Sequence, residues 1–159
     1  MSVSGPTISG LAVSGLGHFD GKTHILPIRV YYEDTDLSGV VYHANYLRYM
    51  ERARTEFFRL AGVTKMADLD SEEPTAWAIR EVRASYHRPA RVDDALSVRT
   101  RLIGISGARI EASQKIYARE TLLVDGRIEA CIITLTGKPR RLPRTLRDLL
   151  TPFLVETDT

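Results

Sequence analysis

Two aspartates and a histidine stand close together in the run YYEDTDLSGVVYH, which ends at His43. Asp34 and Asp36 are separated by one residue, and a tight acidic loop then leads to the histidine. A carboxylate beside an imidazole can activate water, or it can attack a carbonyl carbon itself. The residue types and their spacing therefore predict chemistry at a carbonyl group.

The segments on either side predict where these groups lie. Residues 25–32 are rich in β-branched and aromatic side chains and predict a strand. If the chain stays extended, Tyr32, Asp34 and Asp36 share one face, because side chains alternate. His43 would then lie just before a helix, whose unpaired N–H groups favour a developing negative charge.

The predicted helix is the longest in the chain and ends near Gly62, a favourable C-terminal stop. Its apolar stripe has the helical period and comprises Tyr46, Met50, Ala53, Phe57 and Leu60. The opposite side is charged and carries Arg48, Glu51, Arg52, Arg54, Glu56 and Arg59. Arg52 and Glu56 are spaced to pair across one turn. An apolar stripe of this length is expected to lie against a sheet.

A structural interpretation of the acidic loop stays open on pattern alone. Aspartate in a strand-to-helix turn commonly forms the turn or caps the helix, and His43 could do the same.

The run YYEDTDLSGVVYHANYLRYMERARTE closely resembles the acyl-CoA thioesterases of the 4-hydroxybenzoyl-CoA thioesterase superfamily, and most of all its tol-pal-associated (YbgC-like) branch. The similarity continues through SYHRPARVDDAL and ends near KPRRLP, so it covers about residues 25–145. It implies an α+β hotdog fold, in which an antiparallel sheet of about five strands wraps around one long helix. It also implies that no metal and no cofactor is needed.

The same resemblance assigns roles to three residues. Asp36 falls on the family's catalytic carboxylate, as general base or as nucleophile. His43 would orient the thioester or the water, and Tyr32 would position Asp36 or the acyl group. Leu37 and Ser38 stand where the family often has Ala-Gly or Gly-Gly, which leaves the choice of acyl group open.

The function implied is hydrolysis of a fatty or aromatic acyl-CoA to free acid and CoA. The family also implies a homodimer or a homotetramer built as a dimer of dimers, with active sites at the dimer interface, and an acyl carrier protein as a possible carrier of the substrate. The alternative from another class is a non-catalytic module that binds acyl-CoA or acyl carrier protein on the same scaffold. A hydratase on this scaffold is a weaker alternative.

The rest of the chain predicts one domain over residues 25–155, preceded by a flexible tail over residues 1–24 that is rich in glycine and serine. A short helical turn is expected at 64–70, and alternating strands then follow, with a bulge near Arg80. The last hairpin turn is either Arg119-Glu120, which the family favours, or Asp125-Gly126, the stronger turn signal. A short helix is expected at 145–154.

Charge and cysteine content narrow the function classes. The net charge of +2 predicts no nucleic-acid partner. No apolar run approaches the roughly 20 residues that span a membrane. Cys131 is the only cysteine, which excludes an internal disulfide and fits a reducing, cytoplasmic location.

A basic cluster near the C-terminus is either a solvated surface or a clamp for the phosphates of CoA. Its members are Lys138, Arg140, Arg141, Arg144 and Arg147, and Arg109 could join them. Arg88 and Arg91, beside Pro89, are interpreted as structural or interface groups.

Overall fold

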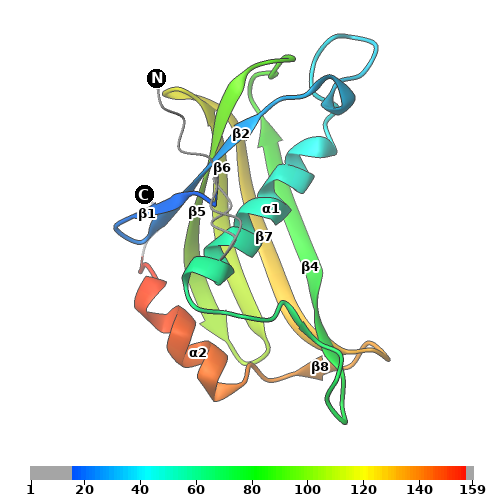
Figure 1. Ribbon diagram of the computed structural model, residues 1–159, viewed down its shortest axis with the longest axis vertical. Coiled ribbons are helices and arrows are strands. Elements are labelled where there is room, and N and C mark those ends of the chain that lie inside the picture. The colour runs from blue at the N-terminus through cyan, green and yellow to red at the C-terminus, as the bar shows by residue number, and fades with distance from the viewer. Residues whose placement is uncertain (1–15, 157–159) are drawn as a thin grey trace, which may run out of the picture.

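The computed structural model describes residues 16–156, in which eight strands form one antiparallel sheet around a long helix (Figure 1). The strands are β1 (His18–Asp20), β2 (Thr23–Arg29), β3 (Ala67–Asp68), β4 (Thr75–Tyr86), β5 (Ala95–Ser106), β6 (Arg109–Ala118), β7 (Thr121–Thr134) and β8 (Pro139–Arg140). The helices are α1 (Asn45–Leu60) and α2 (Arg144–Leu150), with 3-10 turns η1 (Tyr32–Asp34) and η2 (Thr151–Phe153). Among these residues, no helix has the length and apolar content needed to cross a membrane.

The sheet has the order β1-β2-β5-β6-β7-β4-β3, and β8 pairs with β7. The expected count of about five strands is wrong, because β1, β3 and β8 are additional pairings of only two or three residues at the edges. The long strands β2, β4, β5, β6 and β7 account for the five that were predicted.

Helix α1 lies diagonally across the concave face of the sheet (Figure 1). Met50 on this helix is fully buried and packs against Gly126 of β7, where an added Cβ would lie 2.6 Å from the Met50 methyl carbon. Beside it, the buried Gln114 side chain donates to the Met50 carbonyl oxygen over 2.8 Å and to the Thr100 hydroxyl over 2.9 Å. The middle of the helix is therefore fixed to the sheet by close packing and by hydrogen bonds.

The predicted helix is confirmed, and its stripe is correct except at one end. Leu60 is 42% exposed, whereas Tyr49 and Phe58 are buried. The reason is that the sheet curves around the helix and covers more than one narrow stripe. Arg54, expected on the charged side, is instead half-buried and donates to Gln114 over 2.8 Å. Glu56 pairs with Arg59 over 3.4 Å and not with Arg52.

Two predicted segments are corrected. Residues 16–24 fall in the expected flexible tail, yet β1 and the start of β2 form a hairpin there, and His24 is fully buried against Phe19 and Phe57. The remaining part of that predicted tail, residues 1–15, lies outside the described residues. The helical turn expected at 64–70 is instead β3, which pairs with the start of β4.

The later strands follow the predicted alternation. The register of β4 on β7 shifts between Ile79 and Glu81, which confirms the bulge expected near Arg80. The hairpin from β6 to β7 turns at Arg119-Glu120, and Arg119 has a positive φ of 56°. Asp125 and Gly126 lie inside β7. The short C-terminal helix is confirmed as α2 and η2.

Candidate active site

The loop that holds the two aspartates begins earlier than predicted. Strand β2 ends at Arg29, and residues 32–34 form the turn η1 in place of extended chain. The prediction that Tyr32, Asp34 and Asp36 share one strand face is therefore wrong. The Tyr32 side chain is 86% exposed, and its carbonyl oxygen accepts from the amide and hydroxyl of Thr35.

Asp34 has a structural role in this loop. Its Oδ2 accepts from the Tyr31 amide over 2.8 Å. Its carbonyl oxygen accepts from the Asn45 side chain over 2.8 Å and from the Tyr42 amide over 2.9 Å. These bonds hold the loop against the first residue of α1, so the turn-forming interpretation is correct for this aspartate.

Asp36 has a different environment, because its side chain is exposed. Its Oδ1 accepts from the Ser38 amide over 2.8 Å and from the Ser38 hydroxyl. These two bonds, the hydroxyl first, hold the pKa of Asp36 below its usual range, and His43 contributes a smaller effect in the same direction. Oδ2 accepts no hydrogen bond from another of the described residues, so one oxygen of this exposed, ionised carboxylate stays free.

His43 lies between this loop and α1. Its ring centroid is 4.5 Å from that of Tyr42 and 6.4 Å from that of Tyr86. The Tyr86 hydroxyl donates to the His43 carbonyl oxygen over 3.0 Å. Within the described residues, the backbone amides of His43 and Ala44 donate to no protein group. Two free N–H groups at a helix N-terminus suit an oxyanion.

A cavity of about 270 Å³ adjoins His43. It is lined by Val41, His43, Tyr46, Tyr86, His87, Arg88 and Pro89. Sequence reasoning missed Tyr86 and His87 as site residues and interpreted Arg88 as structural. The available signal was the alternation of Val82, Ala84 and Tyr86, which predicts the side of β4 that faces the helix. It does not predict that the strand ends beside His43.

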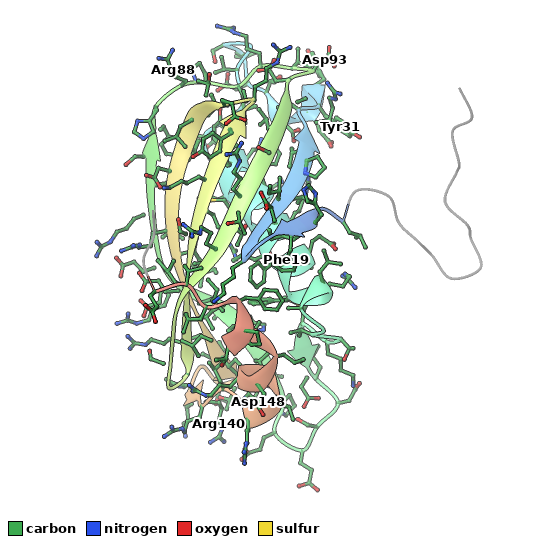
Figure 2. All side chains as sticks on the ribbon, turned by 90° about the vertical axis from the view of Figure 1, so that its left-hand side faces the viewer. Phe19, Tyr31, Arg88, Asp93, Arg140 and Asp148 are labelled. Atoms are coloured by element: carbon green, nitrogen blue, oxygen red, sulfur yellow. The ribbon has the colours of Figure 1, made fainter. Side chains whose placement is uncertain are left out.

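The candidate CoA-binding residues do not gather around Asp36 in one chain. Figure 2 places Arg140 and Asp148 at one end of the molecule and Tyr31, Arg88 and Asp93 at the other. Arg140 pairs with Glu73 over 2.7 Å, and Arg109 pairs with Glu129 over 3.2 Å.

Lys138 and Arg141 differ from these two arginines in their pairing. Both are exposed, and neither forms an ion pair within the described residues. Within residues 16–156, no three or more His, Cys, Asp or Glu side chains gather so that they could hold a metal ion.

Comparisons with known proteins identify the family of the chain. The family model described as "Thioesterase-like superfamily" matches residues 30–150. The chain belongs to this superfamily. It is 40% identical over 122 residues to the acyl-CoA thioester hydrolase YbgC of Escherichia coli O6:H1, with 76% of this chain and 90% of that protein covered. It is 37% identical over 122 residues to the acyl-CoA thioesterase YbgC of Haemophilus influenzae, and this match covers 76% of this chain and 89% of that protein.

Solved structures of this superfamily share the fold. The crystal structure of a probable thioesterase from Bartonella henselae has a TM-score of 0.72 and 41% sequence identity, and the match covers 77% of this chain and 98% of that one. The hotdog fold and the thioesterase family predicted from the loop-and-helix motif are confirmed.

Proposed function

We propose that the protein hydrolyses acyl-CoA thioesters to a free acid and CoA, with Asp36 as the catalytic carboxylate. The observation that carries this proposal is the exposed Asp36, whose pKa is lowered by Ser38, together with His43 and the free amides of His43 and Ala44 just before α1. Relatives at 37–40% identity are named acyl-CoA thioester hydrolases or thioesterases, which supports the same activity.

The geometry supports a metal-independent attack on the thioester carbonyl. As general base, the free Oδ2 of Asp36 takes a proton from water while the water oxygen attacks the carbonyl carbon. As nucleophile, the same oxygen attacks directly and forms an anhydride that water then opens. In either route the amides of His43 and Ala44 stabilise the oxyanion. The carbon–sulfur bond breaks when the tetrahedral intermediate collapses, and in the nucleophilic route this collapse forms the anhydride. CoA leaves as the thiol, with a proton from Asp36 in the general-base route and from water in the nucleophilic route.

A second copy of the chain completes the site in this proposal. Strand β4 pairs with β7 along one edge, while on the other edge β3 covers only Thr75 and Ala76. The uncovered part carries Ile79, Val82 and Tyr86, which are 40–47% exposed. A long apolar edge strand is a template for pairing with another chain. A homodimer through β4 would cover these side chains and close the solvent side of the Asp36 loop.

Three finer assignments are part of this proposal. A single, unpaired cysteine fits a cytoplasmic location. The link to the tol-pal system and the use of an acyl carrier protein substrate rest on the motif resemblance alone. Tyr32 keeps its proposed role as a residue that contacts the acyl group, although its side chain forms no hydrogen bond with Asp36 in the described part of the chain.

Thiol release from a panel of short, long and aromatic acyl-CoAs tests the proposal. Asp36→Asn should lower kcat by about 100-fold or more, since the general-base or nucleophilic oxygen is lost. The matched control is Asp20→Asn, which changes an exposed carboxylate at the last residue of β1. Full activity in Asp36→Asn, or no release by the wild-type protein from any thioester, would overturn the assignment.

A further inference from the structure

The loop between β4 and β5, residues 87–94, holds the Asp36 loop in place. The Val41 amide donates to the Ala90 carbonyl oxygen over 2.8 Å, and the Asp36 amide donates to the Val40 carbonyl oxygen over 3.1 Å. Val40 also forms an isolated bridge with Arg91. The segment that carries the candidate carboxylate is therefore fixed by residues 90 and 91.

Ala90 is itself tied to α1 by one side chain, that of Tyr46. The fully buried Ala90 amide donates to the Tyr46 hydroxyl oxygen over 2.9 Å. Tyr46 is buried, and its ring centroid lies 5.7 Å from that of Tyr86. Three hydrogen bonds thus connect Tyr46 to Asp36, through Ala90 and the pair 40–41.

The same tyrosine lies beside the groups proposed to stabilise the oxyanion. Helix α1 begins at Asn45, so Tyr46 follows closely on the free amides of His43 and Ala44. Tyr86, whose ring lies near that of Tyr46, donates to the His43 carbonyl oxygen over 3.0 Å. Both tyrosines line the cavity of about 270 Å³ that adjoins His43. Tyr46 is therefore linked to the carboxylate side and to the amide side of the site.

We propose that Tyr46 is a positioning residue, whose hydroxyl sets the place of the Asp36 carboxylate relative to the free amides that precede α1. This inference rests on the proposed function and adds to it a residue that does not react. The carboxylate and the N–H groups must meet one thioester carbonyl together, and a displacement of about 1 Å can lower a rate by about 100-fold. Without the hydroxyl, the buried Ala90 amide would have no acceptor, so the loop would have to shift to satisfy it.

The protonation state of Tyr46 suits this role. Burial raises the pKa of Tyr46 above its usual value, and the hydrogen bond from the Ala90 amide opposes this rise. Tyr86 and Asp94 act in the same direction as burial, with smaller effects. The hydroxyl therefore stays neutral near pH 7. Its hydrogen bond to Ala90 should not titrate in the range where Asp36 does.

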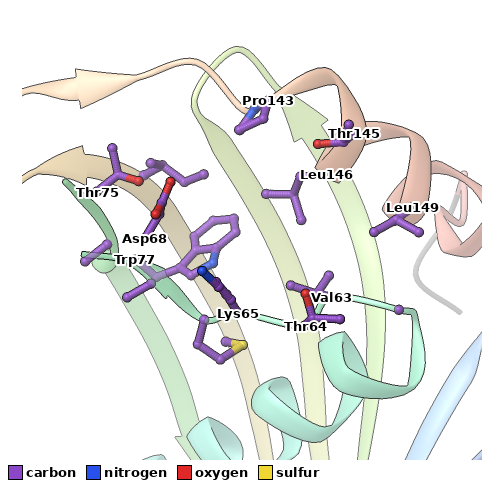
Figure 3. Close-up of a pocket in the computed structure, with 15 residues that line it drawn as sticks. Val63, Thr64, Lys65, Asp68, Thr75, Trp77, Pro143, Thr145, Leu146 and Leu149 are labelled. Carbon is purple, nitrogen blue, oxygen red and sulfur yellow. The ribbon is translucent and has the colours of Figure 1, made fainter. Parts of the chain in front are cut away.

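Tyr46 and Ile110 belong to separate clusters of the core. Tyr46 packs with Val41 and Ala90 near the start of α1. Ile110 belongs to the cluster that includes Phe58, near the end of the helix. Figure 3 shows a cavity of about 390 Å³ at this second end, beside the segment after α1, and it shares no lining residue with the cavity beside the Asp36 loop. A change at Ile110 should therefore destabilise the fold without moving the loop.

The kinetics of Tyr46→Phe test the proposal. This variant should lower kcat for thiol release by about tenfold or more, for short and long acyl-CoAs alike, with KM changed by less than about twofold. Its Tm should also fall, because the buried Ala90 amide loses its acceptor. Ile110→Ala is the control for that loss, since it should lower Tm at least as far and keep kcat within about twofold of wild type. The acidic limb of kcat against pH should not move in Tyr46→Phe, because Ser38 still binds Asp36.

Amide hydrogen exchange tests the positioning without depending on activity. In Tyr46→Phe the Ala90 and Val41 amides should exchange faster by about tenfold or more, because the loop opens locally. In Ile110→Ala both amides should exchange as in the wild-type protein. Tyr117→Phe makes the same substitution on β6 and should change neither the exchange nor kcat.

Three results would overturn the inference. They are a kcat of Tyr46→Phe within about twofold of wild type, a kcat loss of equal size in Ile110→Ala, and unchanged exchange of the Ala90 and Val41 amides. A raised KM at constant kcat would also overturn it, because the hydroxyl would then bind substrate. A wild-type protein that releases no thiol would overturn the proposed function instead, and the exchange rates would still decide whether Tyr46 holds the loop.

Discussion

Gly126→Ala should destabilise the protein, although alanine is normally the better residue inside a strand. Glycine in a strand is less stable than alanine by roughly 0.5–1 kcal/mol, so propensity alone predicts a gain. The structure predicts the opposite, because the new Cβ would lie 2.6 Å from the Met50 methyl carbon and 3.1 Å from both its sulfur and the Gln114 carbonyl oxygen. Overpacking of this kind typically costs about 1–3 kcal/mol.

For a chain of this size, a loss of about 2 kcal/mol corresponds to a Tm lower by roughly 4–8 °C. Urea unfolding followed by the fluorescence of Trp77, the single tryptophan, measures the free energy directly. All variants need the same protein concentration, since the stability of the proposed homodimer would depend on it. Gly104→Ala is the matched control in β5, where an added Cβ meets only the Glu111 side chain, at 3.3 Å.

A double-mutant cycle identifies the cause. Met50→Ala alone should cost about 2–5 kcal/mol because it leaves a cavity. If Met50 is the main obstacle, adding Gly126→Ala to Met50→Ala should cost less than in the wild-type protein, with a coupling of roughly 0.5–3 kcal/mol. A stabilising Gly126→Ala, or additive effects, would refute the argument that α1 packs on β7 at this glycine.

Three further predictions concern the site. Ser38→Ala removes the main cause that lowers the pKa of Asp36, so this pKa should rise and the acidic limb of kcat/KM against pH should move to higher pH; an unmoved limb would show that Asp36 is not the titrating group. Tyr86→Phe should lower kcat by up to about tenfold, the value of one neutral hydrogen bond, while Tm stays constant. Gln114→Leu should lower the unfolding free energy by about 1–3 kcal/mol in urea unfolding, because the half-buried Arg54 loses its acceptor.

The periodic parts of the chain were predictable from sequence, because one residue type repeated at one period determines them. The α1 helix and the alternation along β5 are examples. Gly126 is a position that residue type and periodicity do not explain. Asp125-Gly126 has the composition of a hairpin turn, but the glycine lies inside β7, where the Met50 side chain of α1 occupies the space that a Cβ would need. The turn is instead at Arg119-Glu120, as the family resemblance favours.

The candidate site was only partly predictable, because residue type and spacing do not determine which hydrogen bonds a side chain forms. Asp34 and Asp36 are alike in type and nearly adjacent, and their difference depends on hydrogen bonds from other residues of the loop and from the first residue of α1. Asp34 holds the loop to Asn45, whereas Asp36 binds only Ser38 and keeps one oxygen free. Spacing alone indicates neither outcome, and the assignment of Asp36 as the catalytic carboxylate comes from the motif resemblance.

Strand β4 shows why the other half of the site is hidden from a single sequence. Its concave side chains look like an ordinary core strand, yet α1 leaves Ile79, Val82 and Tyr86 partly uncovered. Burial of such a strand requires a surface from outside the chain, and symmetry then fixes which residues meet.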